Sequence, residues 1–213
     1  MEWLSAFVNV VVHLDQHLLS VVTQYGAWIY ALLFLIVFCE TGLVVTPFLP
    51  GDSLLFVAGT LAGAGAMNVH LLAVLLLIAA VLGDSLNYAI GHYLGPKVFR
   101  FDDSWFFKKA YIERTHQFFE RHGGKTIVIA RFLPIVRTYA PFVAGIGRMN
   151  YSRFLMFNVG GAAIWVGLLV YAGYFFGNLP IIKNNLSLVI AGIIVLSLMP
   201  GIVELVRNKL KRT

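Results

Sequence analysis

Long apolar runs dominate the chain, and polar residues interrupt them at only a few points. Four runs are long enough to cross a bilayer as helices of about 20 residues. We therefore predict membrane-spanning helices at residues 27–46, 70–94, 153–177 and 184–206. Residues 1–26 mix apolar and polar positions, as an amphipathic helix at the membrane interface does. The pattern predicts an all-α polytopic membrane protein, with residues 1–213 forming a single membrane domain.

Two further apolar segments, residues 47–66 and 125–147, carry charges and prolines. Neither pattern is that of a straight helix. Broken backbone at membrane depth is tolerated only where protein or a water-filled cavity surrounds it. We therefore predict two re-entrant loops. The residues expected to shape them are Pro50, Gly51, Pro134 and Pro141.

The two halves of the chain resemble each other. Phe48-Leu49-Pro50 and Phe56-Val57-Ala58-Gly59 recur as Phe132-Leu133-Pro134 and Phe142-Val143-Ala144-Gly145. A unit made of one re-entrant loop and one span crosses the membrane an odd number of times, so its second copy is inverted. Inverted repeats with sites near the midplane are typical of secondary transporters.

Basic residues gather on one side of this predicted topology. Of the 16 lysines and arginines, 13 lie at residues 95–130, at residues 146–153 or in the basic tail at 207–213. The positive-inside rule makes that side cytoplasmic, together with both termini. The linker at 95–124 also has the pattern of an amphipathic helix. Because the excess of base follows loop topology, a nucleic-acid partner is not needed to explain it.

Composition agrees with a membrane protein and narrows the chemistry. Hydrophobic residues make up 59% of the chain and charged residues only 12%. The single cysteine, Cys39, excludes a disulfide within the chain. His13 and His17 have the i, i+4 spacing of a zinc helix but lack its adjacent glutamate. The other four histidines show no ligand spacing, so no metal and no cofactor are expected. No nucleophile and base are paired in the loop segments, and we expect no enzyme activity.

Five charged residues fall within the apolar segments, where each costs roughly 2.5–3.5 kcal/mol at the bilayer centre. Arginine offers phosphate a planar fork of donors, whereas a buried carboxylate can exchange a proton. We hypothesise that Arg131 and Arg137 bind an anionic headgroup. Glu40 and Asp52 would hold the arginines in the empty state and take up protons when the anion displaces them. Purely structural ion pairs are the alternative. Asp84 and Asn87 are minor candidates.

Several motifs together resemble the DedA family, within the wider SNARE-associated Golgi protein (VTT-domain) superfamily. They are Cys39-Glu40-Thr41-Gly42, Phe48-Leu49-Pro50-Gly51-Asp52-Ser53, His122-Gly123-Gly124-Lys125 and the stretch from Arg131 to Thr138. The resemblance covers residues 25–206. It implies a bacterial inner-membrane protein with opposed re-entrant loops that depends on proton motive force. It also implies functional positions at Glu40, Asp52, Arg131 and Arg137, and it gives no such support to Asp84.

The residues favour proton-coupled movement of an anionic lipid headgroup across the membrane. The resemblance implies a flippase or scramblase whose substrate is undecaprenyl phosphate or a related anionic phospholipid. Two alternatives stay open. One is a proton-coupled ion or drug transporter. The other is an assembly factor for membrane proteins that transports nothing, which small-residue faces such as Gly160-Gly161-Ala162-Ala163 would suit. A homo-oligomer also stays open.

Overall fold

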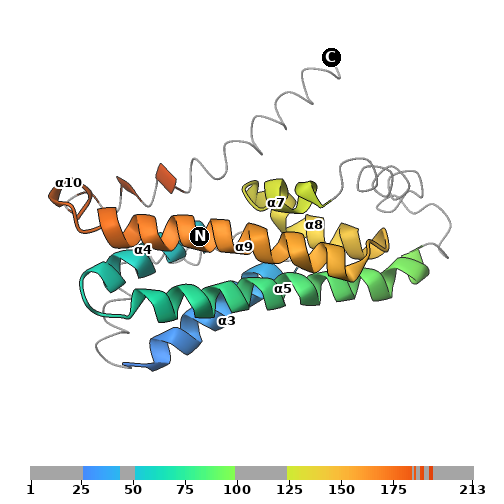
Figure 1. Cartoon of the computed structure of the whole chain (residues 1–213), viewed down its shortest axis with the longest axis horizontal. Helices are drawn as coiled ribbons and strands as arrows, with labels where there is room; N and C mark the ends of the chain where they lie inside the picture. The colour runs from blue at the N-terminus through green and yellow to red at the C-terminus, as the bar shows by residue number, and fades with distance from the viewer. Residues whose placement is uncertain are drawn as a thin grey trace, which may run out of the picture. The chain divides into compact units, whose positions relative to one another are not determined.

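The computed structural model describes residues 26–43, 51–98 and 124–183, together with residues 185, 188, 189, 192 and 193 (Figure 1). These residues form helices and turns, and no strand occurs among them. Five predicted features lie wholly or mostly outside them. They are the amphipathic helix at 1–26, Pro50, most of the linker at 95–124, most of the span at 184–206 and the tail at 207–213.

Two long apolar helices match the predicted spans at 70–94 and 153–177. Helix α5 covers Val69–Val98 and helix α9 covers Tyr151–Phe176. The apolar part of each, Val69–Leu94 in α5 and all of α9, has 26 residues. At a rise of about 1.5 Å per residue such a stretch is about 39 Å long, which exceeds the roughly 30 Å of a hydrocarbon core. Each helix can therefore cross a membrane.

An asparagine fixes the start of each long helix. The side-chain oxygen of Asn68 accepts hydrogen bonds from the backbone N–H groups of His70 and Leu71, both at 3.0 Å. The side-chain oxygen of Asn150 accepts one from Arg153 N–H at 3.3 Å. The first N–H groups of a helix have no partner inside it, and an asparagine at this position satisfies them. These caps explain why both helices begin where they do.

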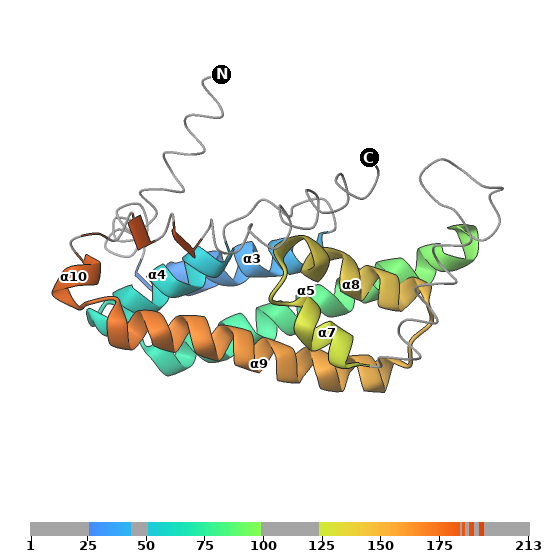
Figure 2. The ribbon, with the colours of Figure 1, turned by 90° about the horizontal axis from the view of Figure 1, so that it is seen from above.

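The second predicted re-entrant segment is a pair of short helices. Helix α7 covers Lys125–Ala130 and helix α8 covers Pro134–Ile146. The two helices contact each other, and the chain reverses direction between them (Figure 2). Pro134 begins α8, where the missing N–H of proline costs no helical hydrogen bond. Pro141 lies inside α8.

The first predicted re-entrant segment contains a continuous helix, α4, over Gly51–Gly63. Gly51 is its first residue. The preceding helix, α3, covers Trp28–Gly42 and is therefore shorter than the span predicted at 27–46. Gly42, the last residue of α3, is a poor helix former. The β-branched residues beyond it precede Pro47, and a proline disfavours helical backbone in the residue before it. One further short helix, α10, covers Pro180–Lys183.

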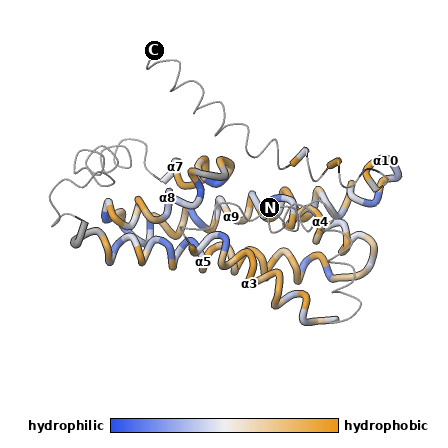
Figure 3. Tube along the Cα trace, turned by 180° about the vertical axis from the view of Figure 1, so that it is seen from behind, coloured by the Kyte–Doolittle hydropathy of each residue, from blue (hydrophilic) through white to orange (hydrophobic). Residues whose placement is uncertain are grey.

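Helix α5 carries apolar side chains on its outward face as well as on its inward face. Large side chains at i, i+3 and i+4 spacing are exposed, namely Leu71, Val74, Ile78, Leu82 and Leu86. The side chains between them are buried, namely Leu72, Leu76, Ala79 and Ala80. Figure 3 shows hydrophobic positions along much of α5 and α3. A continuous exposed apolar stripe is unfavourable in water and favourable in lipid.

The chain divides into two compact units. The first unit comprises 1–36, 48–76 and 165–213, and the second comprises 37–47 and 77–164. In the first unit, α4 packs on the C-terminal part of α9. In the second unit, α8 packs on the C-terminal part of α5.

Glycines permit the close approach of helices in each unit. A β-carbon added at Gly59 would lie 2.1 Å from Val170 O, and one at Gly173 would lie 2.0 Å from Phe56 O. In the second unit a β-carbon at Gly145 would lie 2.1 Å from Tyr88 O, and one at Gly91 would lie 2.0 Å from Phe142 O. Close backbone approach at small residues is the usual way in which membrane helices associate.

Candidate functional site

The second unit contains two ion pairs, and the carboxylate of each is buried. Arg137 in α8 pairs with Glu40 near the end of α3. Arg131, at the end of α7, pairs with Asp84 in α5. Glu40 is 1% exposed, Arg131 4% and Asp84 5%. A buried charge is tolerated when an opposite charge and hydrogen bonds compensate its lost hydration. The pairing explains how these charges can lie inside an apolar protein.

The break between α7 and α8 places both arginines. Arg131 caps α7, and the backbone N–H of Arg137 donates to Leu133 O at 2.8 Å in the first turn of α8. The second helix thus begins between the two arginines. One straight helix through 125–146 would separate them by one and a half to two turns along a single axis. Because the chain reverses instead, the arginines reach carboxylates on two different helices, α3 and α5.

Arg131 also binds a neutral side chain. Its Nη2 donates to Oδ1 of Asn158 in α9 at 2.6 Å. The amide nitrogen of Asn158 in turn donates to Val81 O in α5 at 3.2 Å. Arg131 therefore contacts a carboxylate from α5 and a carboxamide from α9.

Asn87 ties together the backbones beside the other ion pair. Its Nδ2 donates to Thr138 O in α8 at 2.8 Å and to Thr41 O in α3 at 3.2 Å. Thr41 follows Glu40 and Thr138 follows Arg137 in the sequence. Among the described residues, the Oδ1 atom of Asn87 is buried and has no hydrogen-bond partner. Asn87 thus holds α3 and α8 in the register that lets Glu40 reach Arg137.

Asp52 lies in the first unit. It is in the first turn of α4, where the helix dipole favours a negative charge. The indole N–H of Trp165 in α9 donates to its Oδ1 at 2.8 Å. Ser53 next to it is buried. The structure therefore gives Asp52 an indole partner, from a residue that sequence reasoning did not single out.

The structure brings four of the five predicted charged residues together in two ion pairs, and it gives Asp84 a larger part than the sequence did. Asp84, only a minor candidate by sequence, contacts Arg131 directly. Asn158 was missed, although a buried amide in a membrane span indicates a contact between helices. The same signal applies to Asn87. Pro50 lies outside the described residues. Among the described residues, no group of three histidine, cysteine or acidic side chains could hold a metal ion.

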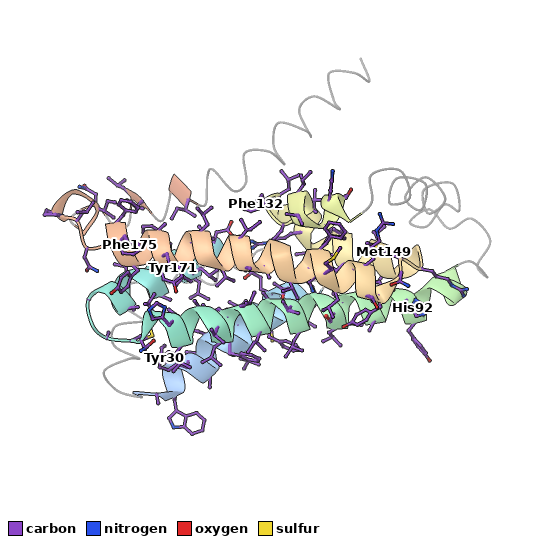
Figure 4. All side chains as sticks on the ribbon, in the orientation of Figure 1. Tyr30, His92, Phe132, Met149, Tyr171 and Phe175 are labelled. Atoms are coloured by element: carbon purple, nitrogen blue, oxygen red, sulfur yellow. The ribbon has the colours of Figure 1, made fainter. Side chains whose placement is uncertain are left out.

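Aromatic side chains hold α5 against α9 in each unit. In the second unit the rings of Tyr88 and Phe154 stack at 4.6 Å, and the hydroxyl of Tyr88 donates to Met149 O. Figure 4 shows Met149 and His92 at this end of the two helices. In the first unit the Tyr171 hydroxyl and His70 Nδ1 are 2.8 Å apart. In the second unit, the contacts of Tyr88 fix the rotation of both helices and hence the directions of Asp84 and Asn158.

Comparison with known proteins identifies the family. The VTT domain matches residues 49–175. The chain is 56% identical over 211 residues to Protein DedA of Escherichia coli (strain K12), which covers 98% of this chain and 96% of that protein. It is 45% identical over 168 residues to an uncharacterized membrane protein of Mycobacterium leprae (strain TN), covering 79% and 75% of the two chains.

A further relative is Inner membrane protein YqjA of Escherichia coli (strain K12), 39% identical over 155 residues, with 72% of this chain and 70% of that protein covered. No solved structure matches the chain. The resemblance suggested by the motifs around Glu40 and Arg131 is confirmed. The chain therefore belongs to the DedA family of VTT-domain membrane proteins.

Proposed function

We propose that the chain is a lipid transporter of the bacterial inner membrane, which moves undecaprenyl phosphate or a related anionic phospholipid and depends on proton motive force. The observation that carries the proposal is the pair of guanidinium groups, each held by a buried carboxylate. Guanidinium matches the geometry of phosphate, with two parallel hydrogen bonds. A phosphate can therefore replace the carboxylate without leaving the arginine uncompensated.

Exchange of partners also explains the coupling to protons. When a phosphate binds Arg137 in place of Glu40, the buried carboxylate of Glu40 loses its counter-ion. A carboxylate without a partner in a low-dielectric site is stabilised by binding a proton. Headgroup binding then draws a proton into the protein, and headgroup release returns it. Asp52 in α4 is the second carboxylate that we assign to proton movement, with Trp165 as its hydrogen-bond partner.

Matching contacts in the two units support an inverted repeat of re-entrant segment plus span. Gly59 packs on Val170 in the first unit as Gly145 packs on Tyr88 in the second. The repeat relates Asn68 to Asn150, and both asparagines cap the span that follows them. Such repeats allow a central site to open to either side in turn. We keep the cytoplasmic assignment of both termini as part of this proposal, and also the absence of enzyme activity.

Transport of the lipid can be measured in proteoliposomes. Labelled undecaprenyl phosphate and labelled phosphatidylglycerol would be followed separately, with and without an imposed proton gradient. We expect one of these lipids to move faster than in protein-free vesicles, and faster with the gradient than without it. Movement of ions or drugs alone would favour the first alternative. If nothing is transported, the assembly factor is favoured.

A conservative variant tests the phosphate contact. Arg137→Lys keeps the charge but loses the fork of donors, which is worth about 1.5–3 kcal/mol, so we expect transport to fall at least about tenfold. Arg153→Lys is the matched control, because Arg153 is exposed in the first turn of α9. It should keep transport within about twofold of the parent. Equal transport by both variants would argue against phosphate recognition at Arg137.

A further inference from the structure

We propose that Asp84 is the resting counter-ion of Arg131, which the phosphate headgroup displaces and which then takes up a proton. The proposal rests on the proposed transport function and assigns a role to a residue that the family resemblance leaves without one. It gives each of the two arginines its own exchangeable carboxylate, Glu40 for Arg137 and Asp84 for Arg131.

The two partners of Arg131 differ in what they can do. Asp84 is a carboxylate and can bind a proton, whereas the carboxamide of Asn158 cannot. Asn158 is also anchored, because its own amide donates to Val81 O at 3.2 Å. Its oxygen lies 2.6 Å from Nη2 of Arg131. Asn158 therefore keeps the guanidinium in place while Asp84 leaves it.

The charges around Asp84 make displacement and proton uptake one event. The positive charges of Arg131 and Arg137 attract the carboxylate of Asp84, and the negative charge of Glu40 attracts the guanidinium of Arg131. These residues come from α3, α5, the end of α7 and α8, while α9 contributes the neutral Asn158. Two arginines and two carboxylates are neutral together. An entering phosphate adds negative charge to a buried site, and protonation of a carboxylate removes it.

The number of carboxylates also bears on the class of headgroup. A phosphate monoester carries about 1.5 to 2 negative charges near pH 7. Glu40 and Asp84 can together take up two protons, which would neutralise a monoester. Glu40 alone could neutralise only a monoanion such as a phosphodiester. Within the described residues of the second unit, these are the two carboxylates. The arrangement thus favours a lipid phosphate monoester.

Binding of a lipid phosphate monoester to the purified full-length protein provides the test. The probe is undecaprenyl phosphate in detergent, with undecaprenol as the neutral control, titrated at several pH values. Because protonated carboxylates do not compete, the parent should bind more tightly as the pH falls. Asp84→Asn removes one competitor permanently. We expect this variant to bind about tenfold more tightly at alkaline pH, with a pH slope of log Kd smaller by about one proton.

Two further variants distinguish an exchangeable counter-ion at Asp84 from a purely structural one. Asp84→Glu keeps a carboxylate and should keep the pH slope of the parent. Asn158→Ala removes an anchor and no competitor, so it should weaken binding and leave the slope unchanged. If folded Asp84→Asn protein binds no more tightly than the parent and keeps its slope, Asp84 is a structural counter-ion and the proposal is overturned.

A proton count keeps the proposal testable if Asp84→Asn fails to fold. In the double variant Glu40→Gln/Asp52→Asn, Asp84 is the remaining carboxylate among the described residues. Lipid binding in weak buffer should still take up about one proton per molecule. Binding without any uptake would remove Asp84 from the exchange. If the parent itself does not distinguish undecaprenyl phosphate from undecaprenol, the proposed function fails, which is a different result from either of these.

Discussion

Replacing Gly173 by alanine tests the close contact between α4 and α9. The new β-carbon would lie 2.0 Å from Phe56 O, 2.9 Å from Phe56 C and 3.0 Å from Thr60 N. Ordinary contact begins at 3.4 Å, so the two helices would have to separate by more than an ångström. All three neighbours are backbone atoms and cannot turn aside as a flexible side chain can.

The expected cost follows from this geometry. Overpacking of a closely packed site costs about 1–3 kcal/mol. Alanine returns about 0.5–1 kcal/mol through its better helix propensity. Taking the middle of both ranges, we expect a net loss of about 1 kcal/mol, or a fall of about 2–4 °C in the melting temperature. Thermal unfolding of the purified protein in detergent would measure it.

Gly167 provides a matched control on the same helix and in the same unit. A β-carbon there would meet nothing within 4 Å, so Gly167→Ala should keep or raise the melting temperature. Gly91→Ala in the second unit should behave like Gly173→Ala, because its β-carbon would lie 2.0 Å from Phe142 O. A melting temperature of Gly173→Ala at or above that of Gly167→Ala would refute a tight backbone contact at Gly173.

Three other substitutions test separate parts of the structure by thermal unfolding in detergent. Glu40→Ala leaves Arg137 without its buried carboxylate and should cost about 3–5 kcal/mol, much of which Glu40→Leu/Arg137→Met should recover; a double variant as unstable as the single one would contradict this. Arg148 has a φ of 53°, so Arg148→Gly should stabilise by about 1 kcal/mol, and a lower melting temperature would speak against backbone strain there. Asn68→Ala removes the cap of α5 and should cost about 0.5–2 kcal/mol, whereas Asn68→Asp should keep most of the stability; equal losses in both would exclude capping.

The hydrophobic pattern was sufficient for the elements whose signals are local. The long runs predicted α5 and α9 to within a few residues, because a span is a property of contiguous sequence. The prolines marked the break that begins α8. The cost of charge in lipid selected Glu40, Asp52, Asp84, Arg131 and Arg137 before any contact was known. The end of α3 was predicted four residues too late, because apolar character continues past Gly42 while helix propensity does not.

Tertiary structure alone decided which charge meets which partner. Glu40 and Arg137 are 97 residues apart in the sequence, and Asp84 and Arg131 are 47 apart. Partner choice depends on the rotation of each helix and on how closely the glycines let helices approach, and neither quantity is encoded in a local pattern. That is why Asp84 looked marginal, Asn158 went unnoticed and the indole partner of Asp52 was not foreseen. The sequence determined that charges inside the membrane need compensation, and packing determined which residues provide it.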